Sequence, residues 1–145
     1  HQITGAGHMK RLLFLSATLA SLFFVAVWIE PSKQTKTLSA SEVTAVDGDT
    51  LDHGEHRYRL VGFDAPETYR PQCRAEKTLG LKAKARLTEL IQSADQIELV
   101  IQPDLDVHDR FLAVGRVAGQ EVGAILISEG LARPYYGGKR RSWCG

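Results

Sequence analysis

The hydrophobic and polar positions divide the chain into an apolar N-terminal run, a short polar stretch and a patterned remainder. Residues 12–29 contain no charged side chain, and Lys10 and Arg11 come directly before them. A run of this length is just long enough to span a bilayer as a helix, and basic residues before it favour a cytoplasmic N-terminus. We therefore expect residues 9–29 to form a signal anchor that exports the rest of the chain.

A cleaved signal peptide is the competing interpretation of this run. The nearest small-residue cleavage site, around 39–41, lies about ten residues past the apolar run, which is farther than such sites usually lie. Both interpretations place the remainder outside the cytoplasm, either on the periplasmic side of the inner membrane or secreted. Residues 1–8 precede Met9, the only methionine, and are expected to be a cloning remnant, while residues 30–39 are polar and predict a linker.

From residue 40 onwards, short runs that contain apolar residues alternate with turn residues. Five such runs predict strands, at 43–47, 50–53, 56–61, 97–102 and 111–118. Apolar residues at helical spacing predict one helix over 74–93, and a second, shorter helix over 121–129 is followed by Gly130. A helix after the third strand and another after the fifth predict an α+β, mainly β fold: a five-stranded Greek-key barrel of the OB type over residues 40–145.

The charge distribution excludes a generic polyanion-binding domain. The whole chain has a net charge of +1, and the part before residue 40 carries +3 because four basic residues outnumber one acidic residue, which leaves −2 for residues 40–145. Affinity for nucleic acid must therefore come from local patches. One such patch is the run of Lys139, Arg140 and Arg141 near the C-terminus.

Candidate chemistry is concentrated between residues 46 and 68. Two predicted hairpins would bring Asp49 close to the loop that carries Asp64 and Glu67. Converging carboxylates raise one another's pKa unless a cation or an arginine lies between them. Oxygen-only ligands of this kind suit calcium better than zinc, so the segment predicts a calcium site.

Three motifs in this segment resemble the staphylococcal (micrococcal) nuclease family: DGDT at 47–50, YRL at 58–60 and DAPE at 64–67, and the resemblance continues to Tyr136. Each motif alone has an ordinary structural explanation, because Asp-Gly forms hairpin turns and proline often begins a helix. Their joint occurrence in this order favours the family. The resemblance implies an OB-type barrel and a calcium-dependent endonuclease, a phosphodiesterase that hydrolyses DNA and RNA with little sequence specificity.

The resemblance also implies roles for individual residues. Calcium would be held by Asp49, Asp64 and the backbone carbonyl of Ala65. Arg59 and Arg110 would bind the charge that develops on the phosphate, because a guanidinium presents a planar fork of donors. Glu67 would act as the general base for the attacking water or orient this water, although nearby cations would lower its pKa and weaken it as a base.

The residues expected to contact the nucleotide lie in two later segments. Tyr135 and Tyr136 lie where the family has tyrosines that stack on the nucleotide, and base stacking tolerates any sequence. The alternative is that both tyrosines pack at the edge of the barrel. His108 and Val107 replace a tyrosine and a lysine of the family; His108 could still donate to a phosphate or be an ordinary exposed loop residue. Lys139, in the basic patch, is a further candidate for substrate binding.

Cys73 and Cys144 are the only cysteines. Two cysteines in an exported domain predict a disulfide, which would tie the C-terminal end to the loop after Glu67. Zinc binding by the pair is the weaker alternative, because two thiols without a nearby His or Cys cluster make a poor zinc site.

The alternative function is a non-catalytic OB-type module that binds single-stranded nucleic acid or a protein partner. The joint presence of the acidic residues, the arginines and the candidate base favours the enzyme, because a binding module has no use for that set. We expect a monomer that contacts the membrane through its N-terminal segment if this segment stays uncleaved.

Overall fold

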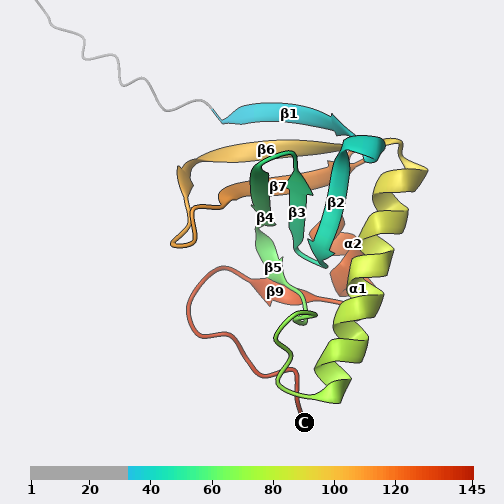
Figure 1. The fold of residues 1–145 in the computed structure, drawn as a ribbon, viewed down its shortest axis with the longest axis vertical. Helices are drawn as coiled ribbons and strands as arrows, with labels where there is room; N and C mark the ends of the chain where they lie inside the picture. Colours follow the sequence, from blue (N-terminus) through green and yellow to red (C-terminus); the bar gives the residue numbers. More distant parts are fainter. Residues whose placement is uncertain (1–32) are drawn as a thin grey trace, which may run out of the picture.

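The computed structural model describes residues 33–145, so the predictions for residues 1–29 lie outside the described part of the chain. A seven-stranded sheet has neighbouring strands in the order β1-β6-β7-β4-β3-β2, with β8 added to β7 (Figure 1). Its strands are β1 (Gln34–Ser39), β2 (Val43–Asp47), β3 (Thr50–His53), β4 (His56–Leu60), β6 (Gln96–Leu105), β7 (Phe111–Val117) and β8 (Gln120–Glu121). A second, two-stranded sheet pairs β5 (Gly62–Asp64) with β9 (Arg133–Tyr135).

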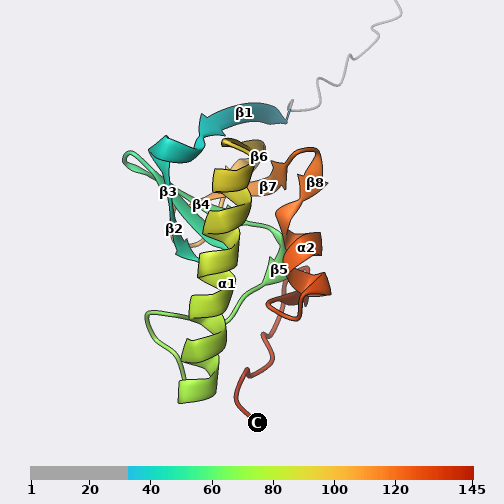
Figure 2. The same cartoon turned by 90° about the vertical axis from the view of Figure 1, so that its right-hand side faces the viewer.

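Two helices cover the sheets, α1 (Arg74–Ser93) and α2 (Val122–Ser128), and they also pack against each other (Figures 1 and 2). The predicted apolar face of α1 is buried, with Ala83 and Leu87 fully enclosed in the core. α1 packs mainly against β2, while α2 packs against β5, β7 and β9. Among residues 33–145, no helix is both long and apolar enough to cross a membrane.

β1 lies in the stretch for which the sequence predicts a linker. It pairs antiparallel with β6, from Gln34 opposite Ile101 to Ser39 opposite Gln96. Only Leu38 in this strand is buried, so no apolar alternation marks the segment as a strand. The linker prediction is wrong for these six residues, because the hydrogen bonds of a strand ladder join backbone groups and need no apolar side chain.

The predicted α+β, mainly β, OB-like architecture is confirmed, and all five predicted strands and both predicted helices are present. A five-stranded Greek-key barrel is not confirmed, because β1 extends the sheet and β5, β8 and β9 add short strands. β4 runs parallel to β7, with Arg59 opposite Leu112. This pairing places Arg59 beside the first residues of β7, which follow Arg110 directly in the sequence.

Two features of α1 position the loop that leads into it. A Cβ atom at Gly80 would lie 2.7 Å from the carbonyl oxygen of Pro66 and 3.0 Å from that of Glu67, so only glycine allows the helix to approach this backbone so closely. The predicted disulfide is formed, and it joins Cys73, the residue before α1, to Cys144. The loop is thus held by the helix on one side and by the C-terminal segment on the other.

Candidate active site

The centre of the candidate site is a buried ion pair between Asp49 and Arg59. Asp49 lies in the turn between β2 and β3, and Arg59 lies near the end of β4, which neighbours β3 in the sheet. An Arg59 guanidinium nitrogen lies 3.3 Å from Asp49 Oδ2, and both side chains are almost completely buried. The Ala65 backbone N–H and the Thr50 hydroxyl also donate to this carboxylate, at 2.9 and 3.0 Å. Burial raises the pKa of Asp49, and the Arg59 charge opposes this shift only in part.

Backbone carbonyl groups hold Arg59 in position. Its guanidinium donates to the carbonyl oxygens of Leu60 and Phe63, the latter at 3.0 Å. A terminal nitrogen of this guanidinium lies 3.7 Å from Asp64 Oδ1, so Arg59 lies between the buried carboxylates of Asp49 and Asp64. Because these contacts fix the side chain, the guanidinium needs little reorganisation to interact with an anion in front of it.

Asp64 ends β5 and receives its remaining contacts from the C-terminal segment. Trp143 Nε1 donates to Asp64 Oδ2 at 3.2 Å, and Arg140 Nε lies 3.3 Å from Oδ1. Asp64 Oδ1 is buried but accepts no hydrogen bond of acceptable geometry from the described residues. A buried carboxylate oxygen without a hydrogen bond retains the capacity to bind a cation.

Glu67 lies at the rim of the site, on the loop between β5 and α1. Its side chain is 43% exposed, and Arg140 donates to its Oε1 at 3.4 Å. Its backbone N–H donates to the buried carboxylate of Glu76, which fixes the loop against α1. Burial raises the pKa of Glu67, and the charges of Asp47 and Asp49 raise it further. Burial and the neighbouring carboxylates outweigh Arg140 in this shift, while the lowering expected from the sequence depends on a bound cation and stays a prediction.

Arg110 reaches the site from the loop before β7, which Asp106 organises. The Asp106 carboxylate accepts hydrogen bonds from the backbone N–H groups of His108 and Arg110, at 2.8 and 3.0 Å, and from Arg110 Nε at 2.7 Å. His108 and Val107 are exposed at the tip of this loop and are not among the described residues that line the cleft. The structure therefore brings Arg110 to the other candidate residues and leaves His108 outside.

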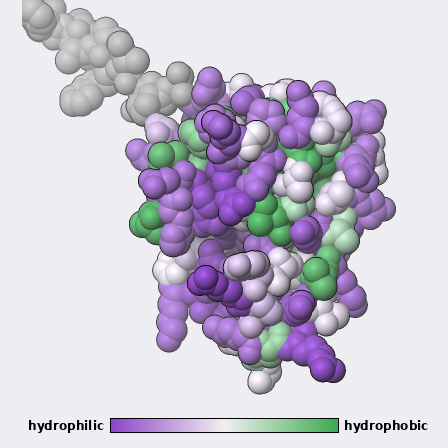
Figure 3. Space-filling view, viewed as in Figure 1, coloured by the Kyte–Doolittle hydropathy of each residue, from purple (hydrophilic) through white to green (hydrophobic). Residues whose placement is uncertain are grey.

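The candidate arginines and tyrosines line a cleft of about 700 Å³, whereas Asp64 lines a neighbouring hollow. Its lining includes three arginines, two tyrosines and apolar side chains: Arg59, Arg110, Arg140, Tyr135, Tyr136, Phe63, Leu112 and Ile127. Tyr136 is 90% exposed, so its ring is available to a ligand, whereas Tyr135 donates its hydroxyl to the Gly138 carbonyl at 2.7 Å. Hydrophilic residues dominate the face of the molecule seen in Figure 3, with small apolar patches between them. The cleft combines cationic and apolar surface, as a site for a phosphate linked to an aromatic base requires.

Lys139 lies beside the main cleft rather than in it. It lines a neighbouring hollow of about 260 Å³ together with Asp64, Arg133 and Arg141. Arg140 lines both hollows. The sequence predicts the run of basic residues at this position only as a general patch and misses the contacts that Arg140 and Trp143 make with Asp64.

The acidic residues have the chemistry that a hard divalent cation requires. Asp49 and Asp64 are buried carboxylates close to the same arginine, and Asp64 Oδ1 accepts no hydrogen bond from residues 33–145. No group of three or more His, Cys, Asp or Glu side chains is gathered as a metal site within residues 33–145. Two carboxylates would therefore have to be completed by carbonyl and water oxygens, which calcium accepts readily.

The profile of the staphylococcal nuclease homologue family matches residues 57–142, which is more than half of the chain. The chain belongs to this family. The resemblance inferred from the three motifs is thus confirmed, and the range shared with staphylococcal nuclease homologues includes Arg59, Asp64, Glu67 and Arg110 but begins after Asp49. A search of curated protein sequences gave no match.

Proposed function

We propose that this staphylococcal nuclease homologue is a calcium-dependent phosphodiesterase that hydrolyses DNA and RNA with little sequence specificity. The proposal is supported by two buried carboxylates, Asp49 and Asp64, that contact Arg59, which lines one cleft together with Arg110. Arg140 lines the same cleft and contacts Glu67. Attack on a phosphodiester builds negative charge on the phosphate oxygens, so a site for this reaction must supply positive charge. The arginines of the cleft supply this positive charge, and they lie next to apolar surface on which a base can lie.

Asp49, Asp64 and the backbone carbonyl of Ala65 are the proposed calcium ligands. Calcium bound there would polarise a phosphate oxygen and organise the attacking water. Burial of Asp49 and Asp64 favours this assignment, because a buried pair of carboxylates attracts a cation more strongly than an exposed pair does.

Arg59 and Arg110 are the proposed binding groups for the transition-state charge. Arg59 is fixed by backbone carbonyls and Arg110 by Asp106, so both guanidinium groups are oriented before substrate binds. Preoriented donors stabilise developing charge without a cost of reorganisation at the moment of reaction.

Glu67 is the proposed proton acceptor for the attacking water. Its position at the rim leaves its carboxylate accessible to water. The pKa of Glu67 is raised by burial and by the Asp47 and Asp49 charges, and a carboxylate with a raised pKa is a stronger base than an ordinary one when it is ionised. Calcium bound nearby would lower this pKa again, so the proposed role as general base is supported by the position of Glu67 and its access to water.

Tyr135 and Tyr136 are proposed to contact the base of the nucleotide, with Tyr136 as the principal stacking surface because its ring is exposed beside the cleft. Lys139 is proposed to bind a neighbouring phosphate of the chain from the adjacent hollow. His108, at the loop tip, would reach only a phosphate outside the cleft. Stacking without base-edge hydrogen bonds accounts for low sequence specificity.

We also propose that the protein works as a monomer outside the cytoplasm, secreted or attached to the periplasmic side of the inner membrane by residues 9–29. The Cys73–Cys144 disulfide supports an oxidising location, because structural disulfides persist there and are rare in the cytosol.

Cleavage of single-stranded DNA by the full chain in calcium, compared between Glu67→Ala and Glu55→Ala, tests the proposed site. Glu55 is an exposed glutamate in the turn between β3 and β4, so its removal controls for the loss of one surface charge. We expect Glu67→Ala to lower kcat by about 10²-fold or more and Glu55→Ala to leave it unchanged. Equal activity of the two variants would contradict the assignment of Glu67.

A non-catalytic binding module remains the second candidate because the described arginines already neutralise both buried carboxylates. Arg59 lies close to Asp49 and Asp64, and Arg140 lies close to Asp64. In such a module the arginines would remain on the carboxylates and calcium would not bind. Binding of single-stranded DNA without any cleavage in calcium would favour this function.

A further inference from the structure

The segment from Gly137 to Cys144, here named the C-terminal strap, passes the active site without forming a helix or a strand. It leaves β9 beside Tyr135 and ends at the disulfide with Cys73, the residue before α1. The C-terminus accordingly lies near the start of α1 in both ribbon views (Figures 1 and 2). The disulfide joins residues that are 71 positions apart in the sequence.

Side chains of β9 hold the strap at two places. The Tyr135 hydroxyl donates to the Gly138 carbonyl at 2.7 Å. Arg133 donates to the carbonyl oxygens of Arg141 and Ser142, and its guanidinium lies 3.7 Å from the centre of the Trp143 ring. These contacts and the disulfide define the path of the strap on both sides of Arg140.

The strap places Arg140 between two acidic residues of the site, Asp64 and Glu67. Arg140 Nε lies 3.3 Å from Asp64 Oδ1, and a terminal nitrogen of the same guanidinium lies 3.4 Å from Glu67 Oε1. The side chain is 40% exposed and lines the main cleft together with Arg59 and Arg110. It therefore occupies a place from which a guanidinium can reach a phosphate that approaches both acidic groups.

We propose that Arg140 is a third substrate-binding arginine and that the Cys73–Cys144 disulfide holds it in the site. The proposal rests on the proposed nuclease function. A divalent cation at Asp64 would repel the Arg140 guanidinium, because like charges at this separation repel. Arg140 would then turn from Asp64 to a substrate phosphate in the cleft, where its planar fork of donors can bind two oxygens.

The disulfide restricts the motion of the strap because it fixes the end of the strap that would otherwise be free. With the disulfide intact, the strap is fixed by β9 at one end and by α1 at the other. After reduction, the part of the strap beyond Arg140 would be held, among the described residues, by the contacts of Arg133 and Trp143. More chain entropy is then lost when substrate orders the strap. Reduction should therefore weaken substrate binding through Arg140 and leave the chemical step largely intact.

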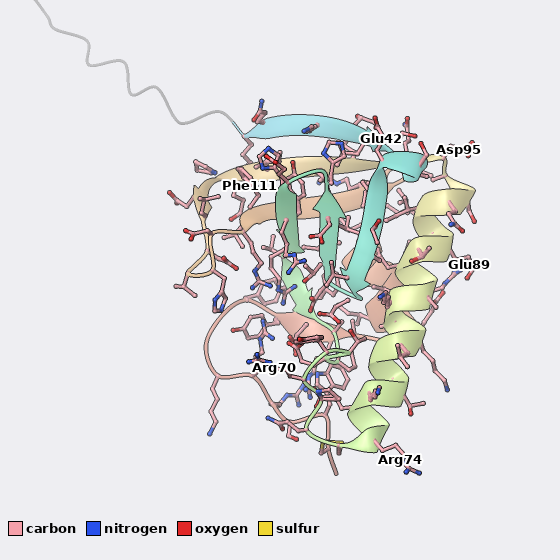
Figure 4. All side chains as sticks on the ribbon, in the orientation of Figure 1. Glu42, Arg70, Arg74, Glu89, Asp95 and Phe111 are labelled. Carbon is pink, nitrogen blue, oxygen red and sulfur yellow. A yellow bond between two sulfur atoms is a disulfide. The ribbon has the colours of Figure 1, made fainter. Side chains whose placement is uncertain are left out.

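The test measures KM and kcat for single-stranded DNA in calcium, with the full chain oxidised and reduced. Arg140→Ala should raise KM about tenfold with a smaller effect on kcat, and Arg140→Lys should restore part of the loss. Arg74→Ala is the matched control, because Arg74 is an exposed arginine next to Cys73 that points away from the sheet (Figure 4). This control should behave as the unsubstituted protein does.

Reduction should raise the KM of the unsubstituted protein and have little effect on the KM of Arg140→Ala, because the arginine through which the disulfide acts is then absent. A Cys73→Ser, Cys144→Ser double variant should reproduce the reduced protein, and circular dichroism establishes that each variant is folded. An unchanged KM in Arg140→Ala, or an equal effect of reduction with and without Arg140, would overturn the proposal while the nuclease function stands. Absence of cleavage by the oxidised, unsubstituted protein would instead overturn the nuclease function itself.

Discussion

Arg57 and Arg59 lie two residues apart on β4, but their surroundings differ. Arg57 is exposed and pairs with Asp52 at 2.6 Å on the surface of the hairpin, whereas Arg59 is buried between Asp49 and Asp64. The chemistry proposed for the cleft depends on the planar donor fork of Arg59 and not on its charge alone. The pair therefore offers a matched comparison within one strand.

We predict that Arg59→Lys lowers kcat for DNA cleavage by about 10²-fold, the usual loss when one preoriented transition-state donor is removed. Arg57→Lys should change kcat by less than about twofold, because exposed ion pairs contribute little. The measurement is steady-state cleavage of a single-stranded oligonucleotide in calcium. Comparable losses in the two variants would show that Arg59 has no special role.

The ionised Asp49 carboxylate should lower the stability of the folded state when calcium is absent. Burial raises its pKa above the ordinary value of 3.8, so the folded state binds a proton more readily than the unfolded state does. Stability therefore decreases as pH rises from the ordinary pKa through the raised one. We predict that the stability of Asp49→Asn in chelator depends less on pH than that of the unsubstituted protein does.

The same substitution should abolish the stabilisation that calcium confers on the unsubstituted protein, since a ligand that binds only the folded state raises its stability. Thermal unfolding in chelator and in excess calcium measures both effects. An Asp49→Asn variant whose stability in chelator depends on pH as strongly as that of the unsubstituted protein, or that calcium still stabilises, would contradict these roles of the carboxylate.

At the scale of elements, helix α1 sets the position of the loop that carries Glu67. Helix propensity favours alanine over glycine by about 1 kcal/mol in a helix interior, but a Cβ at Gly80 would lie within 3.0 Å of two carbonyl oxygens of this loop. We predict that Gly80→Ala lowers both thermal stability and kcat, against its propensity, because rigid backbone must move to admit the methyl group. Lys82→Ala, on the exposed side of the same helix, should lower neither. A more stable Gly80→Ala variant with full activity would show that the contact does not matter.

The elements differ in how well their sequences predict them. α1 has apolar residues at three- and four-residue spacing from Leu79 to Ile91 within a stretch of helical composition, so the helix predicted over 74–93 agrees with the observed Arg74–Ser93. β1 has only Leu38 on the core side, and β5 and β9 contain three residues each. Periodicity cannot identify strands that are so short or so polar, because their pairing depends on a partner strand elsewhere in the chain.

At the scale of the whole molecule, the predictability of the site depends on separation along the chain. Two hairpins bring Asp49 to Asp64 within one continuous segment, so local turn signals predict that they meet. Trp143 and Asp64 are 79 residues apart, and no local pattern relates them. The cysteines were the one long-range signal, since their pairing predicts that the C-terminal end lies beside the site. Which arginine of the basic patch reaches Asp64 depends on the path of the strap and could not be predicted.

The buried carboxylates and the arginines are proposed to form a calcium-dependent nuclease site. The most direct test is the cleavage of single-stranded DNA by the oxidised full chain, first in calcium and then with excess chelator, beside a measurement of DNA binding under both conditions. We expect rapid cleavage in calcium, loss of cleavage in chelator and recovery when calcium is restored. DNA that is bound but stays intact in calcium would contradict the account and identify the protein as a binding module.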